Sequence, residues 1–189
     1  MSPVPQDAAA ACVARVVRED IRAMSGYHVP DSAGLVKLDA MENPYRLPEP
    51  LRAALGRRLS EVALNRYPVP GYARLEATIR ARLGVPDGYE VLLGNGSDEL
   101  LALAIRAFVE PRPRARGAAA SRSIVQFFHP SYSLYPVLAA IHGAGTNAVP
   151  LEPDFGLPSV LRLRQRGQWD FRAALTLVTT PNAPSGRGY

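Results

Sequence analysis

The chain is organised around one stretch, Val91-Leu92-Leu93-Gly94-Asn95-Gly96-Ser97-Asp98-Glu99-Leu100. Its first three residues form an apolar run without helical period, which is typical of a parallel strand covered on both faces. The two glycines can adopt positive φ and let another group approach the backbone closely. Ser97 or Asp98 can cap a helix that follows. The stretch therefore predicts a strand at 90–93, a tight turn and a helix from about residue 97.

This turn has two interpretations. It is either an ordinary strand-to-helix connection with a good cap, since short glycine motifs have many false positives, or an anion site. Free N–H groups at a helix start, beside glycines, form a binding site for phosphate in many proteins. An apolar helical stripe follows in both cases, at Leu100, Leu101, Leu103, Ala104, Ile105 and Phe108. The rest of the chain has to decide between the two.

Strands and helices alternate after this turn. We expect strands at 123–128, 146–151 and 174–179, and helices at 97–109, 131–141 and 157–166. Such alternation predicts an α/β fold with a mainly parallel sheet and helices on its faces. Ligands bind at the carboxyl ends of strands in such sheets, and the distinctive loops lie there: Gly94–Asp98, His129–Tyr132 and Pro181–Gly186. This coincidence favours the anion site.

The first seventy residues read differently. A helical N-terminal arm is expected at 8–24, ended by Ser25-Gly26, and further helices are expected from Glu49 or Pro50 to about residue 60 and at 73–83. Between them lie turn-rich segments with several prolines.

Composition excludes several classes of protein. The 189 residues are 47% apolar and 21% charged, which is ordinary for a soluble globular chain. No apolar run approaches the roughly 18 residues that span a bilayer, so no membrane partner is expected. The single Cys12 excludes an internal disulfide and favours a reducing compartment, the cytoplasm. Cys12 and the three scattered histidines have no metal-ligand spacing, so no metal site is expected.

The positive charge raises the question of nucleic acid. The net charge is +5, and arginines cluster at 112–116 and 162–166. No recognition motif or aromatic interleaving accompanies either cluster. Solvated loops or helix faces are the better interpretation, and no nucleic-acid partner is expected.

Five segments together resemble a known family. In order they are Leu38–Tyr45 (LDAMENPY), Asn65–Pro68 (NRYP), Leu93–Glu99 (LGNGSDE), His129–Tyr135 (HPSYSLY) and Thr180–Gly186 (TPNAPSG). They resemble the fold-type I, pyridoxal-phosphate-dependent aminotransferases, and among these most of all the histidinol-phosphate aminotransferase family. Five ordered matches over nearly the whole chain are far more specific than any one of them.

The resemblance implies an architecture and a reaction. The fold would be three-layer α/β/α, with an N-terminal arm and small-domain portion at 1–70 and the first half of the large cofactor-binding domain at 71–189. The cofactor would be pyridoxal 5'-phosphate. The reaction would move an amino group between glutamate and an imidazole phosphate ester in histidine biosynthesis. The full-length protein would be a homodimer.

The resemblance also implies roles for single residues. The turn of Gly96, Ser97 and Asp98 would hold the cofactor phosphate, and Tyr132 would stack on the pyridine ring; without the resemblance Tyr132 could be a core aromatic. Tyr67 would reach the phosphate bound by the partner subunit, or merely stabilise its own loop.

The remaining implied roles are in the arm and the last loop. Tyr27 and Asn43 would lie near the substrate, although both could equally be turn residues. Asn182 matches one asparagine of the family's Pro181–Gly186 loop. The family has a second asparagine, which bonds the cofactor's phenolic oxygen, where this chain has Ala183. Loss of a hydrogen bond to a charged oxygen costs roughly 1.5–3 kcal/mol, so we expect weaker cofactor binding.

A second departure concerns catalysis. The family's Schiff-base lysine, its acidic partner for the pyridine nitrogen and an arginine follow the Pro181–Gly186 loop, whereas this sequence ends at Tyr189. Its one lysine, Lys37, is in the arm segment, and arginine cannot replace a Schiff-base lysine. The sequence is thus expected to be the N-terminal fragment of an aminotransferase, without a catalytic residue and inactive alone. The alternative is a non-catalytic phosphate-ligand or partner-binding module of the same fold.

Overall fold

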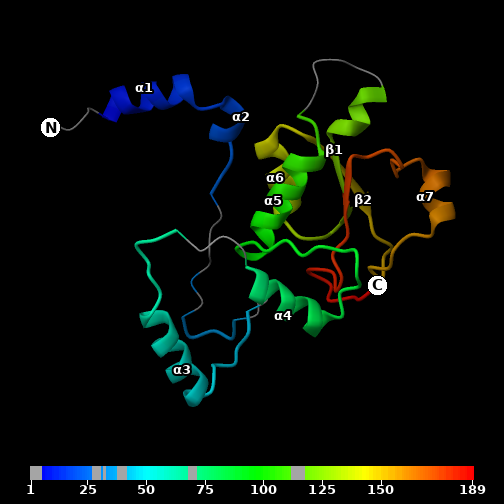
Figure 1. The fold of residues 1–189 in the computed structure, drawn as a ribbon. Coiled ribbons are helices and arrows are strands. Elements are labelled where there is room, and N and C mark those ends of the chain that lie inside the picture. The colour runs from blue at the N-terminus through cyan, green and yellow to red at the C-terminus, as the bar shows by residue number, and fades with distance from the viewer. Residues whose placement is uncertain (1–5, 27–30, 32, 38–41, 68–71, 112–117) are drawn as a thin grey trace. The chain divides into compact units, whose positions relative to one another are not determined.

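The structure is a computed structural model, and it describes residues 6–26, 31, 33–37, 42–67, 72–111 and 118–189 (Figure 1). The chain divides into two compact units. The first combines Met1–Met24 with Leu92–Tyr189, and the second is Ser25–Val91.

The first unit holds most of the regular structure, with bounds close to those expected from the sequence. Its elements are α1 (Gln6–Val16), α2 (Glu19–Arg22), α5 (Gly96–Phe108), the 3-10 helix η1 (Ala118–Ser123), β1 (Ile124–His129), α6 (Leu134–His142), β2 (Gly145–Pro150), α7 (Val160–Arg166) and β3 (Leu175–Leu177). The second unit contains α3 (Glu49–Ser60) and α4 (Ala73–Leu83). The arm helix expected at 8–24 is thus split into α1 and α2.

The three described strands form one parallel sheet in the order β2-β1-β3. Phe127 of the central strand lies opposite Ala148 of β2 and Leu177 of β3. A parallel connection needs a crossover, and α6 and α7 supply the two crossovers of this sheet. The α/β prediction is therefore confirmed.

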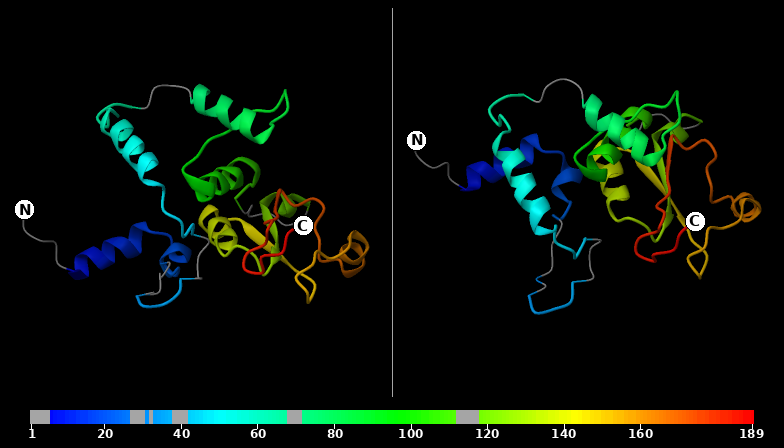
Figure 2. Two further views of the ribbon diagram at one scale, coloured as in Figure 1. Left: turned by 90° about the horizontal axis from the view of Figure 1, so that it is seen from below. Right: turned by 60° about the horizontal axis from the view of Figure 1, so that its bottom comes forward.

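Helices cover both faces of this sheet because the side chains of β1 alternate. One face carries Val125 and Phe127, which pack with residues of α5 and α6 in a cluster that contains Ile105, Val109, Tyr135, Ala139 and Ala144. The other face carries Phe128, which packs with Val149 and with Leu163 of α7. Figures 1 and 2 show α5 and α6 on one side of the strands and α7 on the other.

The prediction of a strand at 90–93 is wrong. Residues 91–94 are irregular, and among the described residues no strand pairs with them. Val91 and Leu93 are half-buried while Leu92 is 71% exposed, so the run is not covered on both faces. An apolar run becomes a strand only where a neighbouring strand accepts and donates its backbone hydrogen bonds, and sequence does not reveal that neighbour.

A buried polar side chain ties the sheet together. Gln126 is 0% exposed, although it lies on the central strand. Its Nε2 donates to Thr176 Oγ1 on β3 (3.1 Å) and to the Asp170 carbonyl (3.3 Å). Its Oε1 accepts from Asn147 Nδ2 on β2 (2.7 Å) and from the Asp170 N–H (2.9 Å). This buried amide thus has partners for all of its donors and acceptors, and two of these partners lie on the neighbouring strands.

Asp170 itself is held in its charged form. A hydrogen bond from the Ser121 side chain, then one from the Arg172 N–H and the nearby Arg172 charge, lower the pKa of its carboxyl against the opposing effect of burial. The segment before β3 is thereby fixed to the end of η1.

Candidate functional site

The candidate site begins at the start of α5, where the backbone is tightly packed. A methyl group at Gly94 would lie 2.7 Å from Leu100 Cδ2, so this position accepts only glycine without rearrangement. Gly96 has φ +83°, a conformation that other residues rarely adopt. The helix starts earlier than the sequence suggested: Asn95, not Ser97 or Asp98, is the N-cap residue.

The cap geometry leaves the first turn of α5 open. Asn95 makes no side-chain capping bond within the described chain. The Glu99 carboxylate accepts from the Asn95 N–H, one residue before the helix. The Gly96 N–H donates to the Gly94 carbonyl (3.0 Å). The N–H groups of Ser97 and Asp98 have no partner inside the helix, so these are the groups that an anion would meet.

The loop after β1 reaches this turn. The Tyr132 hydroxyl donates to Asp98 Oδ1 at 3.0 Å, and the Ser97 hydroxyl donates to the same oxygen at 3.4 Å. Two segments that the sequence singled out separately, 34 residues apart, are therefore in direct contact. The Tyr132 and Tyr135 rings make a perpendicular contact, with centroids 5.7 Å apart and planes at 86°.

The residues after β3 contact the loop after β1 and the first residues of α6. Thr179 Oγ1 lies 3.1 Å from the Ser131 hydroxyl and 2.5 Å from the Tyr135 hydroxyl. Thr179, Ser131 and Tyr135 were not among the site residues predicted from the sequence. Ser131 and Tyr135 lie within the quoted His129–Tyr135 segment, which was the available signal, whereas nothing in the sequence pointed to Thr179.

The side chain of Asn182 hydrogen-bonds within its own loop and to the loop after β1. Asn182 is 3% exposed, and its Nδ2 donates to the Pro130 carbonyl (3.2 Å) and to Ser185 Oγ (3.0 Å). A side-chain amide nitrogen carries two hydrogens, so both are engaged. Ala183, the next residue, is half-buried. The Asn182 side chain therefore anchors the last loop to the loop after β1.

An ion pair fixes the end of this loop. Arg187 Nη1 donates to the Asp154 carbonyl (2.7 Å) and lies 2.8 Å from Asp154 Oδ2. A hydrogen bond from the Gly156 N–H, followed by the Arg187 guanidinium, lowers the pKa of the Asp154 carboxyl. The tight turn after β2 and the last loop are thus held together at the carboxyl-end edge of the sheet.

Other candidate residues lie in the second unit or outside the described residues. Tyr67 is 97% exposed, and Asn43 Oδ1 accepts from the Tyr45 N–H in a local turn. Lys37 Nζ lies 3.8 Å from Glu42 Oε1. Tyr27 lies outside the described residues.

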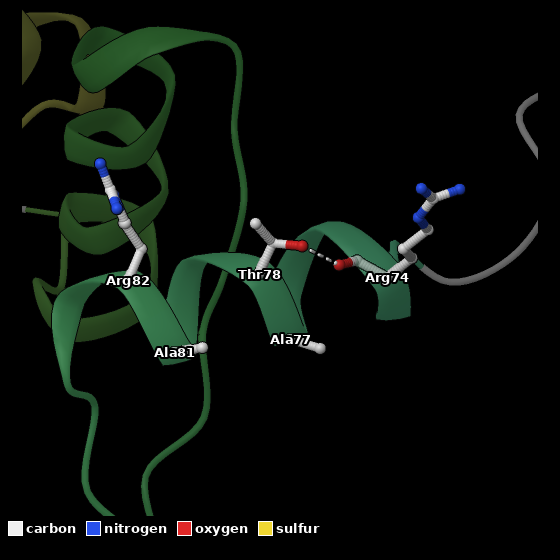
Figure 3. Close-up of a pocket in the computed structure, with 5 residues that line it drawn as sticks. All are labelled: Arg74, Ala77, Thr78, Ala81 and Arg82. Atoms are coloured by element: carbon white, nitrogen blue, oxygen red, sulfur yellow. Dashed lines mark hydrogen bonds between the residues drawn. The ribbon is translucent and has the colours of Figure 1, made fainter.

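A shallow hollow on α4 brings no reactive groups together. It is lined by Arg74, Ala77, Thr78, Ala81 and Arg82 (Figure 3). The Thr78 hydroxyl donates to the Arg74 carbonyl (2.8 Å), and the two arginines lie at opposite ends of the helix. No described helix has the length and apolar character needed to cross a membrane.

Comparison with known proteins identifies the family. No protein-family model matches the chain. It is 44% identical to histidinol-phosphate aminotransferase 2 of Cupriavidus pinatubonensis over 174 residues, which are 92% of this chain and 44% of that protein. It is 38% identical to the histidinol-phosphate aminotransferase of Thiocapsa roseopersicina over 180 residues, which are 94% of this chain and 88% of that protein. The chain belongs to the histidinol-phosphate aminotransferase family.

The chain spans less than half the length of several relatives that it matches. It spans 44% of the Cupriavidus protein and 43% of histidinol-phosphate aminotransferase 1 of Ralstonia nicotianae, so it is less than half as long as either alignment partner. Its structure resembles that of a Burkholderia pseudomallei K96243 protein assigned to the aminotransferases, with a TM-score of 0.56 over 78% of this chain and 40% of that one. At 21% identity this likeness supports the fold alone.

Proposed function

We propose that this member of the histidinol-phosphate aminotransferase family forms the phosphate-binding part of a pyridoxal-phosphate site. The supporting observation is the hydrogen bond between Tyr132 and Asp98, at 3.0 Å. It joins the turn expected to hold a phosphate to the tyrosine expected to stack on a ring. A ligand that carries a phosphate beside a flat ring matches this pairing.

The residues present fit the phosphate and the ring of this cofactor. The first turn of α5 offers N–H groups and the positive end of a helix of 13 residues. Tyr132 is half-buried, its hydroxyl is held by Asp98, and its ring lies perpendicular to that of Tyr135. An aromatic ring held in this way can orient a flat ligand. Bound pyridoxal phosphate supplies the aldehyde that receives and releases the amino group. In this proposal the turn of Gly96, Ser97 and Asp98 binds the phosphate, and Tyr132 orients the ring. The N–H groups of Ser97 and Asp98 are the donors, because that of Gly96 is bonded to the Gly94 carbonyl.

Asn182 has a supporting role in the proposal. Its amide hydrogens hold the Pro130 carbonyl and Ser185, so it shapes the loop beside the cofactor and leaves no hydrogen for the phenolic oxygen. Ala183 supplies no hydrogen-bonding side chain there. Cofactor binding then depends mainly on the phosphate and on ring contact.

The remaining site assignments concern the second unit. We assign Tyr67 to the phosphate of a partner subunit in a homodimer, which its 97% exposure leaves it free to contact. Tyr27 and Asn43 are assigned to the substrate. The domain division at residue 70 belongs to the same proposal, with 1–70 as arm and small-domain portion and 71–189 as the first half of the large domain.

The proposed reaction is that named for the relatives. The complete enzyme would transfer an amino group between glutamate and the imidazole phosphate ester that corresponds to histidinol phosphate, in the cytoplasm. Within residues 1–189 the only lysine is Lys37, which lies 3.8 Å from Glu42 in the second unit. We therefore propose that these residues bind the cofactor without catalysing the transfer.

Binding without turnover is the expected result for the 189-residue chain. In equilibrium dialysis the chain should retain pyridoxal 5'-phosphate. Incubated with the cofactor, histidinol phosphate and 2-oxoglutarate, it should form no glutamate above the level given by the cofactor alone, because its one lysine, Lys37, does not match the family's Schiff-base lysine, which follows the Pro181–Gly186 loop.

The Lys37→Ala variant is the control for this experiment. It should retain the cofactor as well as the wild-type chain and should also lack turnover. Turnover by the wild-type chain that Lys37→Ala abolishes would contradict the proposed division of roles. Failure of the wild-type chain to retain the cofactor would contradict the proposed function itself and leave the alternative of a module that binds another phosphate ligand or a protein partner.

A further inference from the structure

The ring of Tyr132 is held at two points. Its hydroxyl donates to Asp98 Oδ1 at 3.0 Å, and its ring lies perpendicular to the Tyr135 ring, with the two centroids 5.7 Å apart. Tyr135 is 5% exposed and is fixed in turn by Thr179, 2.5 Å from its hydroxyl. The hydrogen bond restrains the hydroxyl of Tyr132, and the perpendicular contact restrains its ring relative to Tyr135.

The Asp98 carboxylate is the point where the turn and the ring meet. Oδ1 accepts from the Tyr132 hydroxyl and, at 3.4 Å, from the Ser97 hydroxyl of the adjacent residue. Asp98 also lies in the first turn of α5, where its own N–H has no partner inside the helix. One side chain thus connects the backbone donors of the turn to an aromatic ring from another segment.

We propose that the Asp98 side chain is a positioning residue: it orients the Tyr132 ring so that a ligand bound by its phosphate at the α5 turn meets the ring face. This inference rests on the proposed function, which uses only the backbone N–H of Asp98. The hydrogen bond between Asp98 and Tyr132 then strengthens the binding of a ligand that carries both a phosphate and a ring. It does not strengthen the binding of a phosphate that has no ring.

The Asp98 side chain has two opposing effects on the affinity for a phosphorylated ring. Its hydrogen bond to Tyr132 strengthens the binding of a phosphorylated ring, whereas its negative charge opposes any nearby phosphate. Simple removal of the side chain changes both at once. Asp98→Asn and Asp98→Ala remove the same charge, but only the asparagine retains an oxygen that accepts from the Tyr132 hydroxyl. The difference between these two variants therefore isolates the hydrogen bond.

The experiment is a calorimetric titration of the wild-type 189-residue chain and of four variants with pyridoxal 5'-phosphate and with inorganic phosphate. Asp98→Asn and Asp98→Ala are made in the wild-type chain and again in the Tyr132→Phe background, which lacks the donor. We expect Asp98→Asn to bind pyridoxal 5'-phosphate about fivefold more tightly than Asp98→Ala when Tyr132 is present, and equally when it is replaced. Inorganic phosphate should not distinguish the two variants in either background.

Each other outcome has a definite meaning. Equal affinity of Asp98→Asn and Asp98→Ala for pyridoxal 5'-phosphate overturns the positioning role, as does a difference that persists in the Tyr132→Phe background. A difference that inorganic phosphate shows equally overturns it too, because the effect would then lie in the turn alone. If the wild-type chain binds no pyridoxal 5'-phosphate, the proposed function fails and this inference fails with it. Binding by the wild-type chain without the expected difference defeats this inference alone.

Discussion

Replacement of Gln126 by alanine is expected to lower the free energy of unfolding of the first unit by about 3 kcal/mol. The Gln126 side chain is 0% exposed and takes part in hydrogen bonds to Asn147, Asp170 and Thr176. Alanine removes these hydrogen bonds and opens a cavity at the central strand. Urea unfolding followed by the fluorescence of the single Trp169 measures the change, because this ring stacks on Phe128 beside β1.

A second glutamine supplies the matched control. Gln165 is exposed on α7, so Gln165→Ala makes the same chemical change without removing a buried network. It should alter the free energy of unfolding by less than about 0.5 kcal/mol. Equal effects of the two substitutions would show that the buried amide does not hold the three strands together.

A negative charge placed in the α5 turn should strongly weaken cofactor binding. Ser97→Asp is expected to raise the dissociation constant for pyridoxal 5'-phosphate at least about tenfold, because a carboxylate within a few ångströms of a phosphate repels it. Binding of pyridoxal, which lacks the phosphate, should change little. Equilibrium dialysis of both compounds against the variant and the wild-type chain gives the comparison.

Ser159→Asp places the same charge at another helix start. Ser159 is the N-cap residue of α7, where its side chain accepts from the Arg162 N–H, and an aspartate fills that role equally well. This control should leave the affinity for pyridoxal 5'-phosphate unchanged. If both variants weaken binding alike, the effect is one of net charge and not of the α5 turn.

The alternating half of the fold was predictable because its apolar pattern repeats. The strand expected at 123–128 corresponds to β1, and the helices expected at 131–141 and 157–166 correspond to α6 and α7. Each of these apolar segments is long enough to show its own period. The run at 91–93 has only three apolar residues and lacks a described partner strand, a tertiary fact that local sequence does not carry. The role of Gln126 was equally hidden, because its partners lie 21, 44 and 50 residues away.

The candidate site was predictable as segments but not as contacts. The glycine turn and the loop of Tyr132 stood out because both follow expected strands at one edge of a sheet. Their hydrogen bond depends on where α5 packs on the sheet, which no spacing reveals. The engagement of both Asn182 hydrogens by Pro130 and Ser185 is a property of the folded loop.

The central claim is that the first turn of α5 receives the phosphate of pyridoxal 5'-phosphate. Titration of the uniformly nitrogen-15-labelled chain, followed by amide NMR, tests it at single residues. The account predicts saturable shifts of the Ser97 and Asp98 amide resonances, absent when pyridoxal replaces the phosphorylated compound. Saturable shifts confined to other segments, or no shifts at saturating cofactor, would contradict it.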